Sequence, residues 1–542
     1  MVSQLDALLT HLGTGRWTVL HLITIPYFSV FLAPHSLGGA FLAPRLDYYC
    51  RVPNKYFNST NLSFLDSEAN TSHSITLREE CQFRTDTQEG EVIEDCDQFD
   101  FDNSTFSSTF TSEYNLACGR AYLQTSFQSM YMLGYFVGAP ISGYLSDKYG
   151  RKPLVMAGYI AYILLGVGSA WLPNLFTILA ARFLIGCLHF INSYTTYVLL
   201  MEVIEPKLRT PVGFMECNLW GVGMMLYGGL GYCIREWRLL QTVMTLPGLL
   251  ILPAVWMIDE SPRWLLVNGR HEEALQVFNK MRKLVEEQVP ESQNTHQYSS
   301  VWLFLKSVTK DAFVLLRTPR LRRITVCIYL NFVVQGMVYF GLSLSGANIS
   351  DDPFLYMVLS GLMEIPAYTL IVPVVQGFGR KFSLCSLYVI CTSVLLILAV
   401  IPIAEHSTAV LVLAMAGKMA IAAGFQTVVF YASELFPTEI RSRGIGTSTM
   451  VSRIGSMMAP FINDMVGAAY PWAPFVIFGL SSLLAAAVTL LLPETRGHTL
   501  PDTVAELEAV GDQTRGPPLM GCERDLPGRG GDGATLAGDC RC

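Results

Sequence analysis

The sequence predicts an all-α membrane protein with twelve transmembrane helices in two six-helix bundles. Three observations support this prediction: an apolar composition, twelve apolar stretches of spanning length, and loop motifs that recur in the same order in the two halves. Of the 542 residues, 51% are hydrophobic and 15% are charged, and the mean hydropathy is +0.37. A soluble domain of this length would leave too much apolar surface in water, so we expect a lipid bilayer around the chain.

The twelve apolar stretches have the length that a bilayer requires, since a span needs roughly twenty mostly apolar residues. Lysines and arginines gather in the loops after the second, fourth, sixth, eighth and tenth stretches, which the positive-inside rule places in the cytosol together with both termini. No basic segment with a cleavage site opens the chain, so the first stretch is expected to be a span. The stretches begin near Trp17, Ala121, Pro153, Asn174, Val212, Leu239, Arg323, Pro353, Phe382, Thr408, Gly444 and Trp472.

The polar segment between the first two stretches, residues 42–120, is expected to lie outside the cell. It combines cysteines with N-x-S/T sequons, and an oxidising, glycosylating compartment uses both. Four cysteines predict two disulfides, and the sequence leaves their pairing open. The cysteines are Cys50, Cys81, Cys96 and Cys118, and the sequons lie at Asn58, Asn61, Asn70 and Asn103.

Composition also divides the chain into segments. A sizeable polar insertion between the sixth and seventh stretches is expected to form a linker with short helices. Beyond about residue 510 the chain is rich in Gly, Pro, Asp and Arg, which bury too little apolar surface to fold alone, so we expect disorder there. The expected segments are a cytosolic N-terminus (1–16), a first half (17–258), a cytosolic linker (259–322), a second half (323–493) and a cytosolic tail (494–542).

Loop motifs recur in order in the two halves, at offsets of 229, 232 and 234 residues. Such collinear copies predict parallel repeats related by an axis along the membrane normal. Their acidic and basic side chains are expected to form a cytosolic gate that closes when the halves approach; the alternative is that they only orient the spans. The motifs are Gly150-Arg151-Lys152 with Gly379-Arg380-Lys381, Glu202 and Arg209 with Glu434 and Arg441, and Glu260-Ser-Pro-Arg263 with Pro493-Glu494-Thr-Arg496.

One of these loops resembles a known signature. The stretch Gly143-Tyr-Leu-Ser-Asp147-Lys-Tyr-Gly150-Arg151-Lys152-Pro153 is similar to the loop signature of the major facilitator superfamily, with every key position filled. Asp147 therefore joins the expected gate. Gln376 stands where the second copy would have Asp, so the polar contacts of the second copy are expected to hold the gate less strongly.

Longer motifs resemble the organic cation, anion and zwitterion transporter family over residues 1–510. The resemblance implies a plasma-membrane glycoprotein that carries small organic ions by alternating access, without a cofactor. The motifs are Glu260-Ser-Pro-Arg-Trp264-Leu, Tyr431-Ala-Ser-Glu434-Leu-Phe-Pro437-Thr-Glu-Ile-Arg441 and Leu492-Pro-Glu-Thr-Arg496. Those that look most like the carnitine and organic cation branch are Glu364-Ile-Pro-Ala-Tyr368, Tyr232-Cys-Ile-Arg-Glu-Trp-Arg238 and Ser452-Arg453-Ile-Gly-Ser456.

Three ionisable side chains, Glu364, Lys418 and Arg453, fall near the middle of predicted spans in the second half. A charge there is costly unless it faces a cavity or a partner, so together they could bind a zwitterion. Alternatively, Glu364 and Lys418 neutralise one another as a buried pair that holds helices. One carboxylate cannot balance two cations, so Arg453 needs a substrate carboxylate or a third protein group. The resemblance implies the former, since anion and zwitterion carriers of the family have Arg here and cation-selective members have Asp.

The remaining substrate-site candidates are mostly aromatic. Tyr339 and Phe340 are preferred because the family usually has aromatic residues there, and ring faces attract an ammonium group. Asn192 is similar to an Asn of the carnitine branch, although Ser193 follows it where that branch has Tyr. Arg182 resembles a recurrent major facilitator arginine, and either a coupling role or structural neutralisation would explain it. The set is completed by Tyr194 and Phe425.

The sequence thus favours alternating-access transport of small organic zwitterions or cations, carnitine-like in charge. An organic anion exchanger is the alternative within transport, and a non-transporting receptor that uses the loop of residues 42–120 is the alternative from another class. An enzyme is not expected, since the nine histidines form no metal-binding spacing and Gly417-Lys418 lacks the flanking residues of a phosphate-binding loop. Nothing predicts nucleic-acid binding. Uphill transport would need an Na⁺ or H⁺ gradient, for which no linear signature exists.

Overall fold

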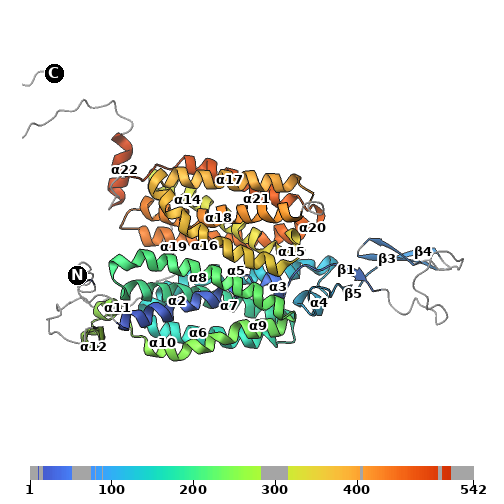
Figure 1. The fold of residues 1–542 in the computed structure, drawn as a ribbon, viewed down its shortest axis with the longest axis horizontal. Coiled ribbons are helices and arrows are strands. Elements are labelled where there is room, and N and C mark those ends of the chain that lie inside the picture. The colour runs from blue at the N-terminus through green and yellow to red at the C-terminus, as the bar shows by residue number, and fades with distance from the viewer. Residues whose placement is uncertain are drawn as a thin grey trace, which may run out of the picture.

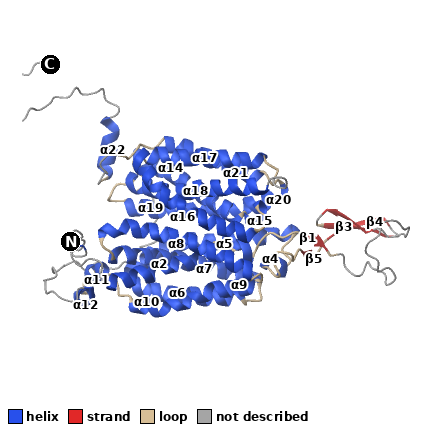
Figure 2. Ribbon diagram, viewed as in Figure 1, coloured by secondary structure: helices blue, strands red, loops and turns tan. Residues whose placement is uncertain are grey.

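The computed structural model describes residue 10 and residues 16–51, 75–79, 81–87, 90–281, 315–402, 407–497 and 503–513. Within these ranges, long helices lie in two layers, one from the first half of the chain and one from the second (Figure 1). Helices dominate both layers, and strands lie at one end of the molecule (Figure 2). The predicted features that fall outside the described residues include most of the N-terminus (1–9 and 11–15), the sequons Asn58, Asn61 and Asn70, residues 282–314 of the linker, and residues 498–502 and 514–542 of the tail.

Six helical segments form the first layer. The sixth is broken because Pro247 lacks a backbone donor and Gly248 follows it, and a 3-10 turn replaces α-helical bonding there. The segments are α2 (Arg16–Ser36), α5 (Ala121–Tyr149), α6 (Arg151–Ala170), α7 (Leu175–Val203), α8 (Pro206–Cys233), and a sixth made of α9 (Trp237–Thr245), η3 (Leu246–Ile251) and α10 (Leu252–Met257).

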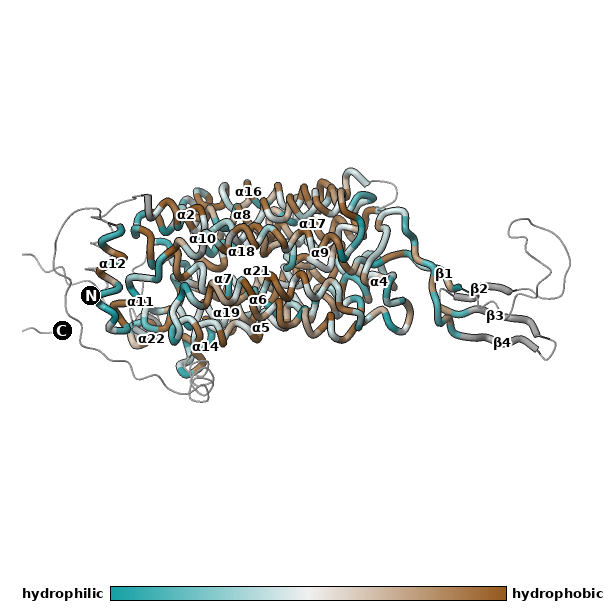
Figure 3. Tube along the Cα trace, turned by 90° about the horizontal axis from the view of Figure 1, so that it is seen from below, coloured by the Kyte–Doolittle hydropathy of each residue, from teal (hydrophilic) through white to brown (hydrophobic). Residues whose placement is uncertain are grey.

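Six more segments form the second layer, and hydrophobic residues run along the bundle helices (Figure 3). Eight of the described helices are long and apolar enough to cross a membrane by length and composition alone. With the two-layer arrangement, this confirms the predicted fold class. The segments are α14 (Pro319–Leu344), α16 (Pro353–Phe378), α17 (Arg380–Val400), α18 (Ser407–Leu435), α19 (Arg441–Phe461) continued by π-helical η4 (Ile462–Val466) and α20 (Gly467–Ala469), and α21 (Ala473–Leu490).

Short elements distinguish the two ends of the bundle (Figure 1). We call the end that carries the strands the strand end, and the opposite end, where Gly150 and Gly379 lie, the latch end. Those near the strand end are α3 (Gly39–Leu42), α4 (Phe110–Glu113), η2 (Cys118–Arg120) and α15 (Gly346–Ile349). Those at the latch end are α11 (Pro262–Val267), α12 (His271–Met281) and α22 (Val504–Gln513).

The segment after α3 forms two small antiparallel sheets, linked to one another by one disulfide, while a second disulfide links the larger sheet to η2. The four cysteines form two bonds, as the sequence predicts, and the structure settles the pairing as Cys50–Cys96 and Cys81–Cys118, each with Cα atoms 5.7 Å apart. One sheet pairs β1 (Tyr48–Cys50) with β5 (Phe99–Phe101), and the other contains β2 (Ile75–Glu79), β3 (Gln82–Thr87) and β4 (Gly90–Asp95).

Two helix pairs join the layers along a seam: α5 packs against α19, and α8 packs against α16. Glycines permit the second approach, since a Cβ on Gly221 would lie 2.9 Å from the carbonyl oxygen of Gly361, and one on Gly361 would lie 2.6 Å from that of Gly221. Near the strand end, Gln124 Nε2 of α5 donates to Asp464 Oδ2 of η4 at 3.3 Å. The two halves are therefore in direct contact from the strand end to the middle of the bundle.

Candidate functional site

Arg453 projects from α19 at the seam and has no counter-charge among the described residues. Its guanidinium carbon lies 3.9 Å from the ring centroid of Tyr135 on α5 and 5.7 Å from that of Phe340 on α14. The residue is 8% exposed, its Nε has no hydrogen-bond acceptor, and it forms no ion pair within the described part of the chain. A buried guanidinium without a partner is costly, so this position favours an anionic ligand.

Glu364 of α16 and Lys418 of α18 neutralise one another. Lys418 Nζ lies 3.0 Å from Glu364 Oε1, and both side chains are fully buried. Tyr339 and Tyr368 donate their hydroxyls to the Glu364 carboxylate, the latter at 3.2 Å, and Lys418 donates to Ser343. Protein groups thus satisfy both charges, and the geometry favours the structural interpretation of this pair over direct substrate contact.

An aromatic layer, defined as Tyr135, His189, Trp220, Tyr339 and Phe425, crosses the seam near the middle of the bundle. His189 lies 5.0 Å from Tyr135 and 6.4 Å from Trp220 between ring centroids. Trp220 Nε1 donates to the Tyr339 hydroxyl at 2.9 Å, and the Tyr339 ring lies 6.0 Å from that of Phe425. The structure thereby joins predicted aromatics of the second half to Tyr135 and His189, which the sequence did not single out because aromatic residues in spans give no distinguishing signal.

Two predicted residues of α7 have other surroundings. Asn192 faces α6 within the first half, since a Cβ on Gly158 would lie 2.0 Å from its Oδ1. Neither amide atom of Asn192 has a hydrogen-bond partner in the described structure. Tyr194 is 40% exposed and stacks on Phe190 with ring centroids 5.8 Å apart. Substrate contact by Asn192 or Tyr194 stays a prediction.

Arg182 of α7 is fully surrounded by neutral groups. Its Nη2 donates to Gln241 Oε1 at 2.7 Å, and its guanidinium lies 4.0 Å from the ring centroid of Phe127. It is 1% exposed and has no carboxylate partner among the described residues. Among the described residues, no acidic side chain neutralises the Arg182 charge. A role of Arg182 in coupling stays a prediction.

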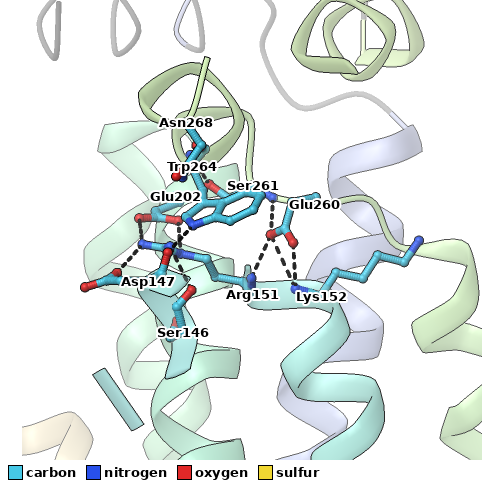
Figure 4. A network of polar contacts seen from close by, with 9 residues as sticks. All are labelled: Ser146, Asp147, Arg151, Lys152, Glu202, Glu260, Ser261, Trp264 and Asn268. Atoms are coloured by element: carbon cyan, nitrogen blue, oxygen red, sulfur yellow. Dashed lines mark hydrogen bonds and ion pairs between the residues drawn. The ribbon is translucent and has the colours of Figure 1, made fainter. Parts of the chain in front are cut away.

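A latch of polar contacts closes the first half at the latch end (Figure 4). The Arg151 guanidinium lies 3.2 Å from both Asp147 and Glu202. Glu260 accepts from the backbone N–H groups of Arg151 at 3.0 Å and Lys152 at 3.1 Å, which are free donors at the start of α6. Three helix ends and the start of the linker are thereby tied together.

The second half repeats this latch. Arg380 lies 2.8 Å from Glu434, and Glu494 accepts from the backbone N–H groups of Arg380 at 3.0 Å and Lys381 at 3.1 Å. Glu494 therefore accepts from two backbone N–H groups at a helix start, as Glu260 does in the first half. Its recurring motif is the sequence signal that indicates this role. Thr495 donates its hydroxyl to Glu434 at 2.6 Å, and a weaker second latch at Gln376 stays a prediction.

The remaining gate candidates lie beside the latches. Arg209 donates to the Met201 carbonyl at 3.1 Å, and Arg441 donates to the Phe436 carbonyl at 3.4 Å, so each binds a carbonyl group near a helix C-terminus. Arg263 lies in the first turn of α11. The ion pairs of both latches join helices of one half, and a gate between the halves stays a prediction.

One carboxylate was missed by the sequence reasoning. Glu216 lies near the middle of α8 (Pro206–Cys233). The predicted apolar stretch begins near Val212, which placed Glu216 close to the start of a span. Ser29 of α2 donates its hydroxyl to Glu216 Oε1 at 3.2 Å. Trp220 of the aromatic layer lies one helical turn away on the same face.

Comparisons by sequence relate the chain to membrane carriers. Residues 78–505 match the family described as sugar (and other) transporter. The organic cation transporter-like protein of Drosophila melanogaster is 33% identical over 94% of this chain and 93% of its own length. Human organic cation/carnitine transporter 2 is 30% identical over 92% of this chain and 93% of its own length. Human solute carrier family 22 member 13 is 34% identical over 77% of this chain and 75% of its own.

Solved structures have the same fold. The xylose transporter XylE from E. coli in an inward open conformation matches with a TM-score of 0.64 at 16% identity, covering 90% of this chain and 98% of that one. Its partially occluded inward open form matches with a TM-score of 0.62 at 16% identity. At this level of identity the likeness establishes the arrangement of the helices alone.

Proposed function

Because the chain belongs to the sugar (and other) transporter family of the major facilitator superfamily, and within it to the organic cation, anion and zwitterion transporters, we propose that it carries small organic zwitterions across the plasma membrane. Its family and fold make it a transmembrane transporter of small organic ions that works by alternating access, and not an enzyme. What we propose beyond the family assignment is that the transported solute is a zwitterion with carnitine-like charges.

The proposal rests on one observation, the uncompensated guanidinium of Arg453 at the seam. A substrate carboxylate would supply the missing counter-charge, and a guanidinium binds carboxylates with paired N–H donors. The rings of Tyr135 and Phe340 would pack against the rest of the solute. Since Tyr135 belongs to the first half and Arg453 to the second, a bound solute would contact both halves, and its release would accompany their separation.

A second candidate is an organic anion exchanger. It is favoured by the ion pair of Glu364 with Lys418, because a neutralised carboxylate does not repel an anion. Arg453 alone would then set the charge preference. The two candidates differ in whether the cargo must carry a positive group.

We also propose that the strand end faces the cell exterior and that the latch end, with both termini, faces the cytosol. Cys50 lies in β1 and Asn103 follows β5, and both strands are at the strand end; Arg151 and Arg380 begin α6 and α17 at the latch end. Transport against a gradient would draw on Na⁺ or H⁺ and would need no cofactor.

Uptake into proteoliposomes that contain the purified protein tests the proposal. Betaine, tetraethylammonium and succinate represent a zwitterion, a cation and a dianion, each measured with and without an inward Na⁺ or H⁺ gradient. We expect saturable betaine uptake. Saturable uptake of succinate alone would favour the anion exchanger, and entry of all three at the rate of protein-free vesicles would reject transport.

A further inference from the structure

We propose that Glu216 is the residue of the first half that binds the positive group of the substrate, as the counterpart of Arg453 in the second half. The inference rests on the proposed function, and it gives the ammonium or quaternary nitrogen of a zwitterion a partner that a guanidinium cannot provide.

The charge of the Glu216 carboxylate is poorly balanced by its described surroundings. It lies near the middle of α8, is half-buried, and forms no ion pair within the described residues. Its hydrogen bond comes from a neutral hydroxyl, Ser29 Oγ at 3.2 Å. One neutral donor does not balance a carboxylate inside a span, where an ionisable group is costly unless it faces a cavity or a partner. A cationic group is therefore missing at this position.

The other described carboxylates near the seam already have protein partners. Glu364 pairs with Lys418 and accepts from Tyr339 and Tyr368. Asp464 lies toward the strand end, where it accepts from Gln124. Glu216 is thus the described carboxylate of the mid-bundle region that remains for a ligand cation.

Glu216 also lies next to the aromatic layer that leads to Arg453. Residues four apart on a helix share a face, so Glu216 lies one turn toward the latch end from Trp220. From Trp220 the aromatic layer continues through His189 and Tyr135 to the Arg453 guanidinium, 3.9 Å from the Tyr135 ring. A row of neighbouring rings therefore runs from the helical turn next to Glu216 to Arg453, and ring faces attract an ammonium group.

The arrangement also has a mechanical consequence. Glu216 belongs to the first half and Arg453 to the second. A solute with charges of both signs would bind a charged side chain of each half at once, whereas a simple cation or anion would bind a charged side chain of one half only. Zwitterions would then stabilise the state in which the halves are close together, which couples cargo binding to the rocking motion.

Ligand binding to the purified full-length protein tests the inference independently of transport, by the ligand-induced rise in Tm with tetraethylammonium, betaine and succinate. Glu216→Gln keeps the size of the side chain and an acceptor for Ser29, while Glu216→Asp keeps the charge. We expect Glu216→Gln to weaken tetraethylammonium and betaine binding on the order of tenfold, with succinate binding unchanged and Glu216→Asp closer to wild type. Ser29→Ala is the matched control, which removes the hydrogen bond but leaves the charge and cation binding.

Unchanged tetraethylammonium and betaine binding in Glu216→Gln would overturn the proposal. Equal losses of succinate and tetraethylammonium binding would also overturn it, because they would indicate general damage to the site. A wild-type protein that binds neither tetraethylammonium nor betaine would overturn it as well. Failure of the proposed function has a different outcome: the wild-type protein would bind betaine but would not move it into proteoliposomes.

Discussion

Lys418 Nζ lies 3.0 Å from Glu364 Oε1, and neither side chain is exposed. Removing one partner of such a pair leaves an uncompensated buried charge, which typically costs about 3–5 kcal/mol, whereas removing both costs much less. We therefore expect Glu364→Gln and Lys418→Met each to lower the Tm strongly, and the double variant to recover much of the loss. Thermal unfolding of the three variants in detergent forms a double-mutant cycle. Losses that simply add would show that the two side chains do not stabilise one another.

The latch glycines hold a backbone conformation that other residues rarely adopt. Gly150 has φ +97° and ψ 164°, and Gly379 has φ +90° and ψ 168°; a Cβ on Gly150 would also lie 2.5 Å from Glu260 Oε2. Alanine at either position should destabilise the protein by about 1–3 kcal/mol. Gly143→Ala is the matched control, since its Cβ would meet nothing within 4 Å. A Tm in Gly150→Ala equal to that of the control would contradict the described latch.

The two latch carboxylates have pKa values shifted in opposite directions. Burial raises the pKa of Glu260 above its ordinary value of 4.5, although backbone N–H groups, including that of Arg151, act against it. Burial also acts on Glu494, but backbone N–H donors such as that of Arg380 outweigh it and hold the pKa below 4.5. Glu494 therefore contributes stability that is complete above about pH 4.5 and is lost as the pH falls through its lowered pKa. The contribution of Glu260 is complete below about pH 4.5 and is lost as the pH rises through its raised pKa.

Opposite pH slopes should follow for the two Gln variants. Between about pH 7 and pH 3, the Tm advantage of wild type over Glu494→Gln should shrink as the pH falls below about 4.5, while its advantage over Glu260→Gln should grow as the pH falls toward about 4.5. Differential scanning fluorimetry across this range measures both slopes. Parallel slopes would show that the two carboxylates do not occupy the different surroundings described above.

Sequence reasoning succeeded where the signal is periodic or repeated. Hydropathy and charge gave the spans, and the recurring Gly-Arg-Lys loops indicated two related halves. It left alternatives open where partners come from distant segments: Glu364 and Lys418 were expected either to bind substrate or to pair with one another, and the partner of Cys50 was undetermined. Glu216 was passed over because it falls close to the start of its predicted apolar stretch.

The central claim is that Arg453 binds a substrate carboxylate, and initial betaine uptake by Arg453→Gln in proteoliposomes tests it most directly. Arg453→Lys, which keeps the charge but loses the paired donors, is the matched control, and tetraethylammonium uptake monitors general damage. We expect Arg453→Gln to raise the KM for betaine on the order of tenfold or more while tetraethylammonium uptake persists, with Arg453→Lys intermediate. Betaine uptake by Arg453→Gln at the wild-type rate and KM would contradict the account.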